Sequence, residues 1–246
     1  MSALLRERDA EAVARAAAGA LAEIARAALR ERGVFTLALA GGDTPRRLYQ
    51  RLAADGGVDW ARAELFFGDE RPVPPEHPDS NYGMARATLI APLAIAAARV
   101  HRIEAERADL DAAARDYEAE IVRVAGRGPD AAAPRLDLVL LGMGPDGHTA
   151  SLFPRTAALA ETRRLVVAND VPQLATRRIT ITFALIEQAR RVLVLVCGES
   201  KADALAQVWE GPWDPERWPS QRLRDGGERV TWWVDAAAAG RLRARA

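Results

Sequence analysis

The most chemically suggestive stretch of the chain is DLVLLGMGPDGHTASLFP, residues 137–154. An apolar run of strand type leads into a glycine-rich turn, and His148 follows two residues after Asp146. An imidazole, with an ordinary pKa of about 6.5, can accept a proton close to neutral pH. The pattern predicts that His148 is a general base and that Asp146 orients its ring or holds a charge beside it. The alternative is a histidine that only caps a helix starting near Thr149.

A second candidate site is the turn AGGDTP, residues 40–45, which follows the apolar run VFTLALA. Gly41 and Gly42 allow the backbone to approach a ligand closely, and Pro45 is typical of the first turn of a helix. Amide groups at a helix start attract anions, and Thr44 adds a hydroxyl. The turn therefore predicts an anion site, although a plain tight turn would use the same residues.

Charged residues follow the apolar residues Leu65–Phe67, in the segment FFGDERPVPPEHPDSN. Asp69, Glu70 and Arg71 could be a solvated cluster, which is the usual fate of such a triplet. The preceding Phe-Phe-Gly and the proline-rich loop behind them indicate instead a fixed arrangement at a strand end.

Two further cations stand at or just beyond predicted strands. Arg178 lies in RRITITF, and Lys201 follows VLVLVCG. Lys201 is the single lysine among the 34 basic residues. Arg178 and Lys201 would clamp a phosphate if they converge on the glycine turn at 41–44, but their spacing in sequence does not establish that convergence.

These candidates need a scaffold, and the hydrophobic pattern indicates an α/β fold. Apolar residues recur at helical spacing over 9–31, with Gly33 as the predicted end. Further helices are expected at 46–54, from Ser80–Asn81, at 109–125, near Thr149, at Lys201 and at the alanine-rich C-terminal end. Strands are expected at 34–40, 64–70, 136–142, 177–183, 191–198 and 230–234. Strands that alternate with helices, several of them apolar on both faces, predict a mostly parallel sheet covered on both sides.

Two connections are distinct. Residues 126–135 form a predicted linker, and residues 211–227, rich in Pro, Gly and Trp, form one long loop that is either a lid or a surface connection.

The composition excludes several classes of function. Lys plus Arg (34) equals Asp plus Glu (34), so no overall charge favours nucleic acid or an anionic membrane. One cysteine, Cys197, excludes an internal disulfide. No apolar run approaches the roughly 20 residues that span a bilayer, and the mixed charges of the first residues do not resemble a targeting peptide. We expect a single cytoplasmic domain over residues 1–246, monomeric or a weak homodimer.

The blocks AGGDTP, GDERPVPPEHPDSN, LGMGPDGHTASLFP, RRITIT and GESKADAL, in this order, resemble the 6-phosphogluconolactonase family of the glucosamine-6-phosphate isomerase/6-phosphogluconolactonase superfamily. The resemblance runs from about residue 34 to the VTWWVDAAAA segment. It implies the three-layer α/β sandwich with a mostly parallel, Rossmann-like sheet found in glucosamine-6-phosphate deaminase and ribose-5-phosphate isomerase. It also implies hydrolysis of 6-phospho-D-glucono-1,5-lactone to 6-phospho-D-gluconate in the oxidative pentose phosphate pathway.

The resemblance also implies roles for individual residues. His148 is expected to activate water, with Arg71 beside it. The phosphate is expected on Gly41, Gly42 and Thr44, with help from Arg178 and Lys201. No metal or organic cofactor is implied, and the expected partner is the sugar-phosphate lactone alone.

One position departs from the family pattern, because Asp43 stands where the turn commonly has serine. A carboxylate there would repel a phosphate unless it turns away. Aspartate is favourable at a helix N-cap, so we expect Asp43 to cap the helix, to offer its backbone N–H to the ligand and to direct its carboxylate elsewhere.

Two alternatives belong to other classes of function. An aldose-ketose isomerase or deaminase of this fold carries HxDEY where this chain has FGDER, and an acidic residue in an FNEP segment where this chain has SLFP. A non-catalytic sugar-phosphate sensor could lose its base, whereas His148, Asp146 and Arg71 are all present. The chain also has no basic arm or DNA-binding segment.

Overall fold

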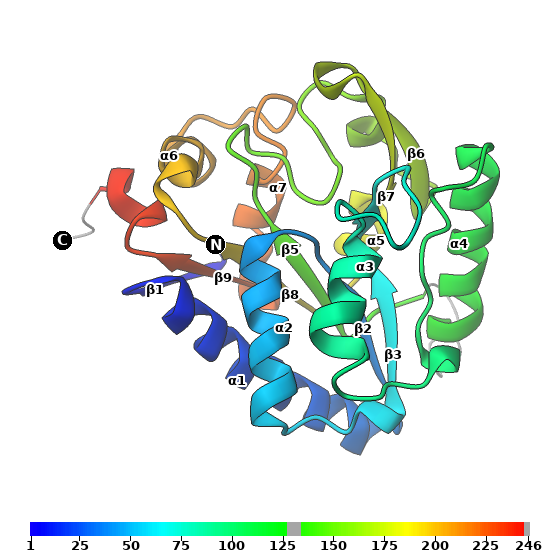
Figure 1. Cartoon of the computed structure of the whole chain (residues 1–246). Coiled ribbons are helices and arrows are strands. Elements are labelled where there is room, and N and C mark those ends of the chain that lie inside the picture. The colour runs from blue at the N-terminus through cyan, green and yellow to red at the C-terminus, as the bar shows by residue number, and fades with distance from the viewer. Residues whose placement is uncertain (127–133, 244–246) are drawn as a thin grey trace.

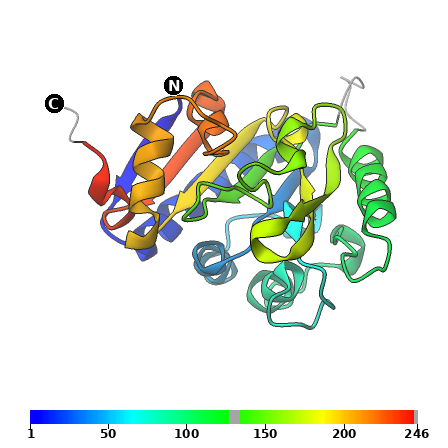
Figure 2. The same cartoon turned by 90° about the horizontal axis from the view of Figure 1, so that it is seen from above.

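A six-stranded parallel sheet runs through the computed structural model, which describes residues 1–126 and 134–243. Its strands, in order across the sheet, are β1 (Ala3–Glu7), β9 (Val230–Asp235), β8 (Arg191–Val196), β5 (Leu138–Gly142), β2 (Phe35–Leu39) and β3 (Ala63–Phe67). Figures 1 and 2 show helices on both faces of this sheet, so the predicted α/β sandwich is confirmed. Most of the predicted linker 126–135 lies outside the described residues.

The helices divide between the two faces. Seen from above, α1 (Ala10–Arg32), α2 (Asp43–Asp55) and α3 (Asn81–Ala85) lie on one side of the sheet, and α5 (Phe183–Ile186) and α7 (Gln221–Arg224) lie on the other (Figure 2). The side chain of Asp9 accepts a hydrogen bond from the N–H of Ala12 at the start of α1, and Gly33 ends that helix with φ 74°. The helix predicted at 9–31 is therefore observed with its predicted end.

A second, three-stranded sheet was not predicted. It is antiparallel and consists of β4 (Asp69–Glu70), β7 (Thr176–Ile181) and β6 (Val166–Val171). The strand expected at 64–70 breaks at Gly68, whose N–H donates to Leu39 in the large sheet while its carbonyl accepts from Ile181 in the small one. Helix α4 (Leu110–Ala125) packs against the small sheet. Gly68 therefore joins two sheets rather than continuing one strand.

Other expectations about elements were wrong. No helix begins near Thr149, because the Thr149 hydroxyl donates to the carbonyl of Gly142 at 2.8 Å and the chain turns back at Leu152. The alanine-rich C-terminal segment forms only a short 3-10 turn at Ala238–Arg241. Lys201 ends a 3-10 turn directly before α6 (Ala202–Glu210), close to the expected helix.

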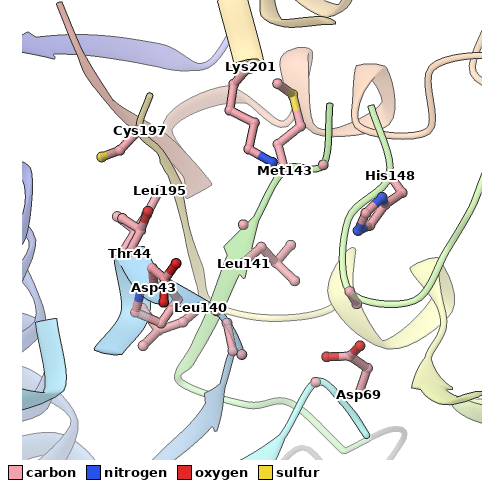
Figure 3. A pocket seen from close by; sticks show the side chains of 18 of the residues that line it. Asp43, Thr44, Asp69, Leu140, Leu141, Met143, His148, Leu195, Cys197 and Lys201 are labelled. Atoms are coloured by element: carbon pink, nitrogen blue, oxygen red, sulfur yellow. The ribbon is translucent and has the colours of Figure 1, made fainter. Parts of the chain in front are cut away.

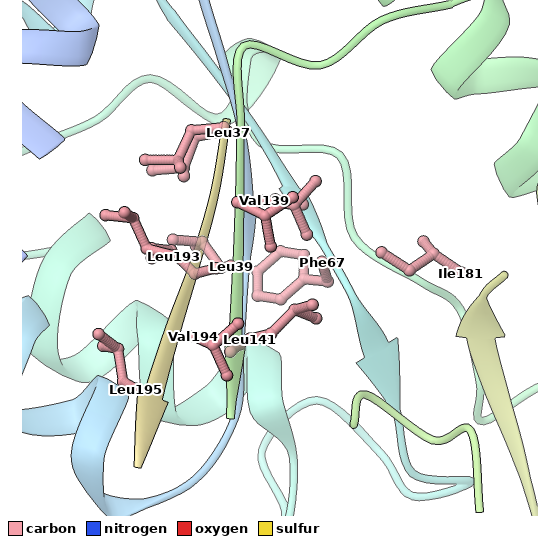
Figure 4. Packing of buried hydrophobic residues seen from close by; sticks show 14 of the residues in the cluster. Leu37, Leu39, Phe67, Val139, Leu141, Ile181, Leu193, Val194 and Leu195 are labelled. Atoms are coloured by element: carbon pink, nitrogen blue, oxygen red, sulfur yellow. The ribbon is translucent and has the colours of Figure 1, made fainter. Parts of the chain in front are cut away.

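The core lies mainly between the large sheet and its helices (Figure 4). All five residues of β2 are buried, as expected for a central parallel strand. Ile181 of the small sheet belongs to the same apolar cluster as Leu37, Val139 and Phe67 of the large one. The wall that the small sheet adds to the molecule is therefore anchored in the main core.

A buried ion pair joins strands at the amino ends of the sheet. Asp137 is 3% exposed, and one of its oxygens accepts from the N–H of Thr36 at 2.9 Å and from its hydroxyl at 3.0 Å. The other oxygen lies 2.9 Å from Arg32 and 3.4 Å from Arg190. Removing the carboxylate would leave buried donors without acceptors.

We therefore expect Asp137→Ala to lower the free energy of unfolding by about 3 kcal/mol, the loss typical of a broken buried pair. Asp59→Ala is the matched control, because its pair with Arg62 is exposed and worth at most about 1 kcal/mol. Urea unfolding of both variants measures the difference, and equal losses would contradict the prediction.

Candidate active site

A cavity of about 340 Å³ opens at the carboxyl ends of the central strands (Figure 3). Ligands of open α/β sheets bind at this edge, where the loops that follow each strand meet. The cavity is lined by every residue predicted for the site except Asp146, namely Gly41, Gly42, Thr44, Arg71, His148, Arg178 and Lys201. Asp146 contacts His148 directly. The fold therefore brings together segments that are far apart in the sequence.

His148 is held by its own turn. Its ring Nδ1 lies 2.5 Å from Oδ1 of Asp146, and the same oxygen accepts its backbone N–H at 3.2 Å. The ring stacks on Phe153, with centroids 4.1 Å apart and an angle of 27° between the planes. A proton on Nδ1 in this pair leaves Nε2 as an acceptor, and the imidazole points into the cavity (Figure 3).

The charge of Asp146 is preserved in this pair. Burial opposes the ionised carboxylate, but the hydrogen bond and the positive charge of His148 outweigh it, so the pKa of Asp146 is lowered. An ionised Asp146 can therefore fix the tautomer of the ring and stabilise an imidazolium.

The glycines of this turn are required by space and by conformation. A Cβ at Gly144 would lie 2.1 Å from Nδ1 of His148 and 2.6 Å from Oδ1 of Asp146. Gly147 has φ 79°, in the left-handed region that favours glycine. Side chains at these two positions would therefore disturb the histidine directly.

The glycine turn at 41–44 forms the start of α2. Gly42 is the N-cap, with φ 99°, and no side chain caps this helix. A Cβ at Gly41 would lie 1.8 Å from the side-chain oxygen of Asn81, so the close packing here also requires glycine. The amides at the start of a 13-residue helix face the cavity edge, which is the geometry of an anion site.

The prediction that Asp43 caps α2 was wrong. Asp43 is the first helical residue, one position after the cap, and its side chain is 96% exposed, with Arg46 3.8 Å away. Glycine takes the cap because the chain there adopts a positive φ that aspartate would adopt only with strain. The carboxylate is exposed, but Asp43 also lines the cavity, so the direction of its carboxylate away from a ligand stays a prediction.

Glu70 organises the loop that leads to the cavity. Its carboxylate accepts the N–H groups of Arg71, Asn81 and Tyr82 at 2.8 to 2.9 Å, and the hydroxyl of Ser80 at 3.1 Å. Burial raises the pKa of Glu70, although these backbone donors act in the opposite direction. The triplet at 69–71 is thus a fixed arrangement and not a solvated cluster.

Arg71 and Arg178 lie on the wall made by the small sheet. Both line the cavity, and each has a buried Nε atom without a hydrogen-bond partner among the described residues. One terminal nitrogen of the Arg71 guanidinium donates to the carbonyl of Asp79. Burial lowers the pKa of Arg178; the charge of Asp69 acts against this and that of Arg71 adds to it. The unpartnered, buried Nε atoms of these two arginines indicate a site for an anion.

Lys201 approaches the cavity from a different wall, after β8. Burial lowers the pKa of its ammonium, and the nearby charge of Asp146 partly restores it. Its strongest charged neighbour is thus Asp146, whereas those of Arg178 are Asp69 and Arg71. The two cations reach the cavity from separate sides.

Two of the titratable residues that line the cavity, Asp69 and Cys197, were not assigned to the site from sequence. Asp69 is 7% exposed, accepts from Ser151 at 2.5 Å and from the amide of Asn81 at 3.0 Å, and lines the cavity. Its position in the GDER block was the available signal. Cys197 also lines the cavity; burial raises its pKa to about 11.

Among residues 1–126 and 134–243, no group of three or more His, Cys, Asp or Glu side chains is arranged to hold a metal ion. Within the same residues, no helix has both the length and the apolar character needed to cross a membrane.

Comparison with known proteins agrees with the fold. The family described as Glucosamine-6-phosphate isomerases/6-phosphogluconolactonase matches residues 8–232. The 6-phosphogluconolactonase of Synechocystis sp. is 41% identical over 221 residues, 88% of each chain, and that of Mycobacterium tuberculosis is 39% identical over 222 residues, again 88% of each. The 6-phosphogluconolactonase structure from Trypanosoma brucei superposes with a TM-score of 0.85 at 28% identity over 99% of both chains.

A monomeric glucosamine-6-phosphate deaminase shares the fold, with a TM-score of 0.80 at 23% identity over 97% of this chain and 99% of its own. The fold and cavity define an α/β protein with a cavity lined by arginine, lysine and histidine side chains at the carboxyl ends of its strands. The chain belongs to the glucosamine-6-phosphate isomerase/6-phosphogluconolactonase family.

The turn geometry generates a prediction for Gly144→Ala. The added methyl group must displace His148 or Asp146. The kcat for hydrolysis of the 6-phosphogluconolactone is therefore expected to fall by about 100-fold, the loss typical of a misplaced reacting group. Gly19→Ala is the control, because a Cβ there meets nothing within 4 Å. Steady-state kinetics on both variants test this, and a fully active Gly144→Ala enzyme would exclude the predicted displacement.

Proposed function

We propose that this chain hydrolyses 6-phospho-D-glucono-1,5-lactone to 6-phospho-D-gluconate, with His148 as the general base. The observation that carries the proposal is the His148–Asp146 pair at 2.5 Å, whose imidazole faces a cavity also lined by Arg71, Arg178 and Lys201. One base and several cations suit a neutral ester bond attached to an anionic sugar phosphate.

In the first step, Nε2 of His148 takes a proton from water as the water oxygen attacks the lactone carbonyl. Asp146 holds Nδ1 and stabilises the imidazolium that forms, as the orienting carboxylate does in other histidine-dependent hydrolases. The carbonyl oxygen becomes an oxyanion. A positioned base of this kind contributes about 10²- to 10⁴-fold to a rate.

Arg71 is the proposed partner of the oxyanion. Its unpartnered buried Nε lies at the cavity wall, and the position of its backbone is fixed by Glu70. Collapse of the tetrahedral intermediate breaks the bond between the carbonyl carbon and the ring oxygen, and the imidazolium returns its proton to that oxygen. The products are a hydroxyl and a carboxylic acid, which ionises at neutral pH.

The phosphate is proposed to bind the amides of Gly41 and Gly42 and the hydroxyl of Thr44, with positive charge from Lys201 and Arg178. The start of α2 and the unpartnered Nε of Arg178 support this assignment. Anchoring the distant phosphate positions the lactone carbonyl next to His148, so binding energy is used for orientation.

The remaining proposals concern the pathway, the cellular location, the oligomeric state and the partners of the enzyme. The reaction belongs to the oxidative pentose phosphate pathway, and we place the enzyme in the cytoplasm as a monomer or weak homodimer, without nucleic-acid, membrane or cofactor requirements.

His148→Ala is expected to lower kcat by about 100-fold or more, because the proton acceptor is removed, while 6-phosphogluconate still binds. Lactone hydrolysis at neutral pH, corrected for the spontaneous reaction, measures the loss. His77→Ala is the control, since that side chain is 43% exposed on a surface loop. Wild-type kcat in His148→Ala would remove His148 from the mechanism.

Lys201→Met is expected to raise KM by about 10- to 100-fold, since one charge-assisted hydrogen bond to the phosphate is lost. Asp43→Ser is the matched variant in the same pocket; its exposed carboxylate predicts a KM within about three-fold of wild type. Initial rates over a range of lactone concentrations separate the two. An unchanged KM in Lys201→Met would place the phosphate elsewhere.

A further inference from the structure

Residues Trp213–Ser220, here called the Trp218 loop, pack against the turn that carries His148. The N–H of Ser220 donates to the carbonyl of Gly147 at 3.0 Å. The indole of Trp218 covers the α-carbon of Gly147 so closely that a Cβ there would lie 2.7 Å from the ring. Gly147 directly precedes His148, so these contacts act on the backbone that carries the imidazole.

The Trp218 loop also bonds to the segment 147–155, which begins beside His148, at its C-terminal end. The N–H of Arg155 donates to the carbonyl of Glu216 at 3.0 Å. Between these two attachments the chain has positive φ at Gly147 (79°), Ala150 (47°) and Arg155 (59°). Left-handed non-glycine residues persist only where their surroundings impose them. The loop thus bonds to the segment at two of its three left-handed residues.

The Trp218 loop is itself fixed from within the protein. Gln221 is fully buried; its amide nitrogen donates to the carbonyls of Gln207 at 3.0 Å and Pro212 at 2.8 Å, and its oxygen accepts the N–H of Asp214 at 2.6 Å. The N–H of Trp218 donates to the carbonyl of Asp214 at 2.8 Å. These hydrogen bonds hold the inner side of the loop against the protein, which favours a surface connection over a lid.

We propose that Trp218 is a positioning residue for the lactonase reaction: it holds Gly147 and thereby fixes His148 between Asp146 and Phe153. Trp218 is not among the described residues that line the cavity, so it acts through the turn and not through substrate. The proposal rests on the assignment of His148 as the base. A shift of the ring by about 1 Å is enough to cost a large part of the rate.

The test uses the full chain with Trp218→Leu, Trp218→Phe and the control Trp213→Leu. Trp213 lies in the same loop but is 55% exposed and stacks on Arg224, away from Gly147. For each variant, kcat and KM for the lactone, the affinity for 6-phosphogluconate and the thermal unfolding midpoint are measured.

In Trp218→Leu, kcat is expected to fall about ten-fold or more while KM and product affinity stay within about three-fold. Trp218→Phe, which keeps a flat ring, restores most of the rate, and Trp213→Leu behaves as wild type. A purely structural role would lower the unfolding midpoint without this separation of kcat from KM.

Wild-type kcat in Trp218→Leu, or an equal loss in Trp213→Leu, overturns the proposal. If Trp218→Leu does not fold, Trp218→Met, which also removes the flat ring, decides: a loss of kcat at unchanged KM supports positioning, and full activity contradicts it. His148→Ala, measured in parallel, separates the two hypotheses. If His148→Ala is fully active, the assignment of His148 as the base is wrong. If His148→Ala loses activity but the Trp218 variants are fully active, only the positioning role of Trp218 is wrong.

Discussion

One carboxylate oxygen, Oδ1 of Asp146, accepts both the backbone N–H and the ring Nδ1 of His148. For one oxygen to accept both hydrogen bonds, the backbone must form a tight turn between Asp146 and His148. The N–H of Gly144 accordingly donates to the carbonyl of His148 at 2.9 Å, and the N–H of Gly147 donates to the carbonyl of Gly144 at 3.1 Å. The glycines, the aspartate and the histidine of this turn therefore depend on one another, because each is needed for the same hydrogen-bonded backbone conformation.

The rest of the site depends on how two sheets meet beside that turn. The large sheet delivers the glycine turn, the histidine turn and the segment of Lys201 to one edge, as parallel strands must. The small sheet adds Arg71 and Arg178 on a separate wall, and Asp69 reaches back to bond Ser151 at 2.5 Å. The antiparallel sheet thus closes a side that a parallel sheet alone would leave open.

The local signals in the sequence were sufficient for five of the six strands of the large sheet, whereas its edge strand β1 was not predicted. The apolar runs at 34–40 and 136–142 become β2 and β5, and Gly33 ends α1 as its position predicts. What failed depends on distant partners. The two-residue strand β4 exists only through β7, and the side chain of Thr149 bonds a carbonyl at the end of β5 instead of starting a helix. Periodicity within one segment carries no information about such bonds.

The cavity gives a chain without net charge a local group of positive charges, from Arg71, Arg178 and Lys201. Burial lowers the pKa of both Arg178 and Lys201, so water solvates these groups poorly. Asp69 and Asp146 act in the opposite direction and favour the charged forms, while the Nε atoms of Arg71 and Arg178 lack partners among the described residues. A phosphate or an oxyanion would satisfy those donors without rearrangement of the protein. Folding therefore desolvates and positions these positive charges before a ligand binds. Such preorganised charges are what strong binding and catalysis require.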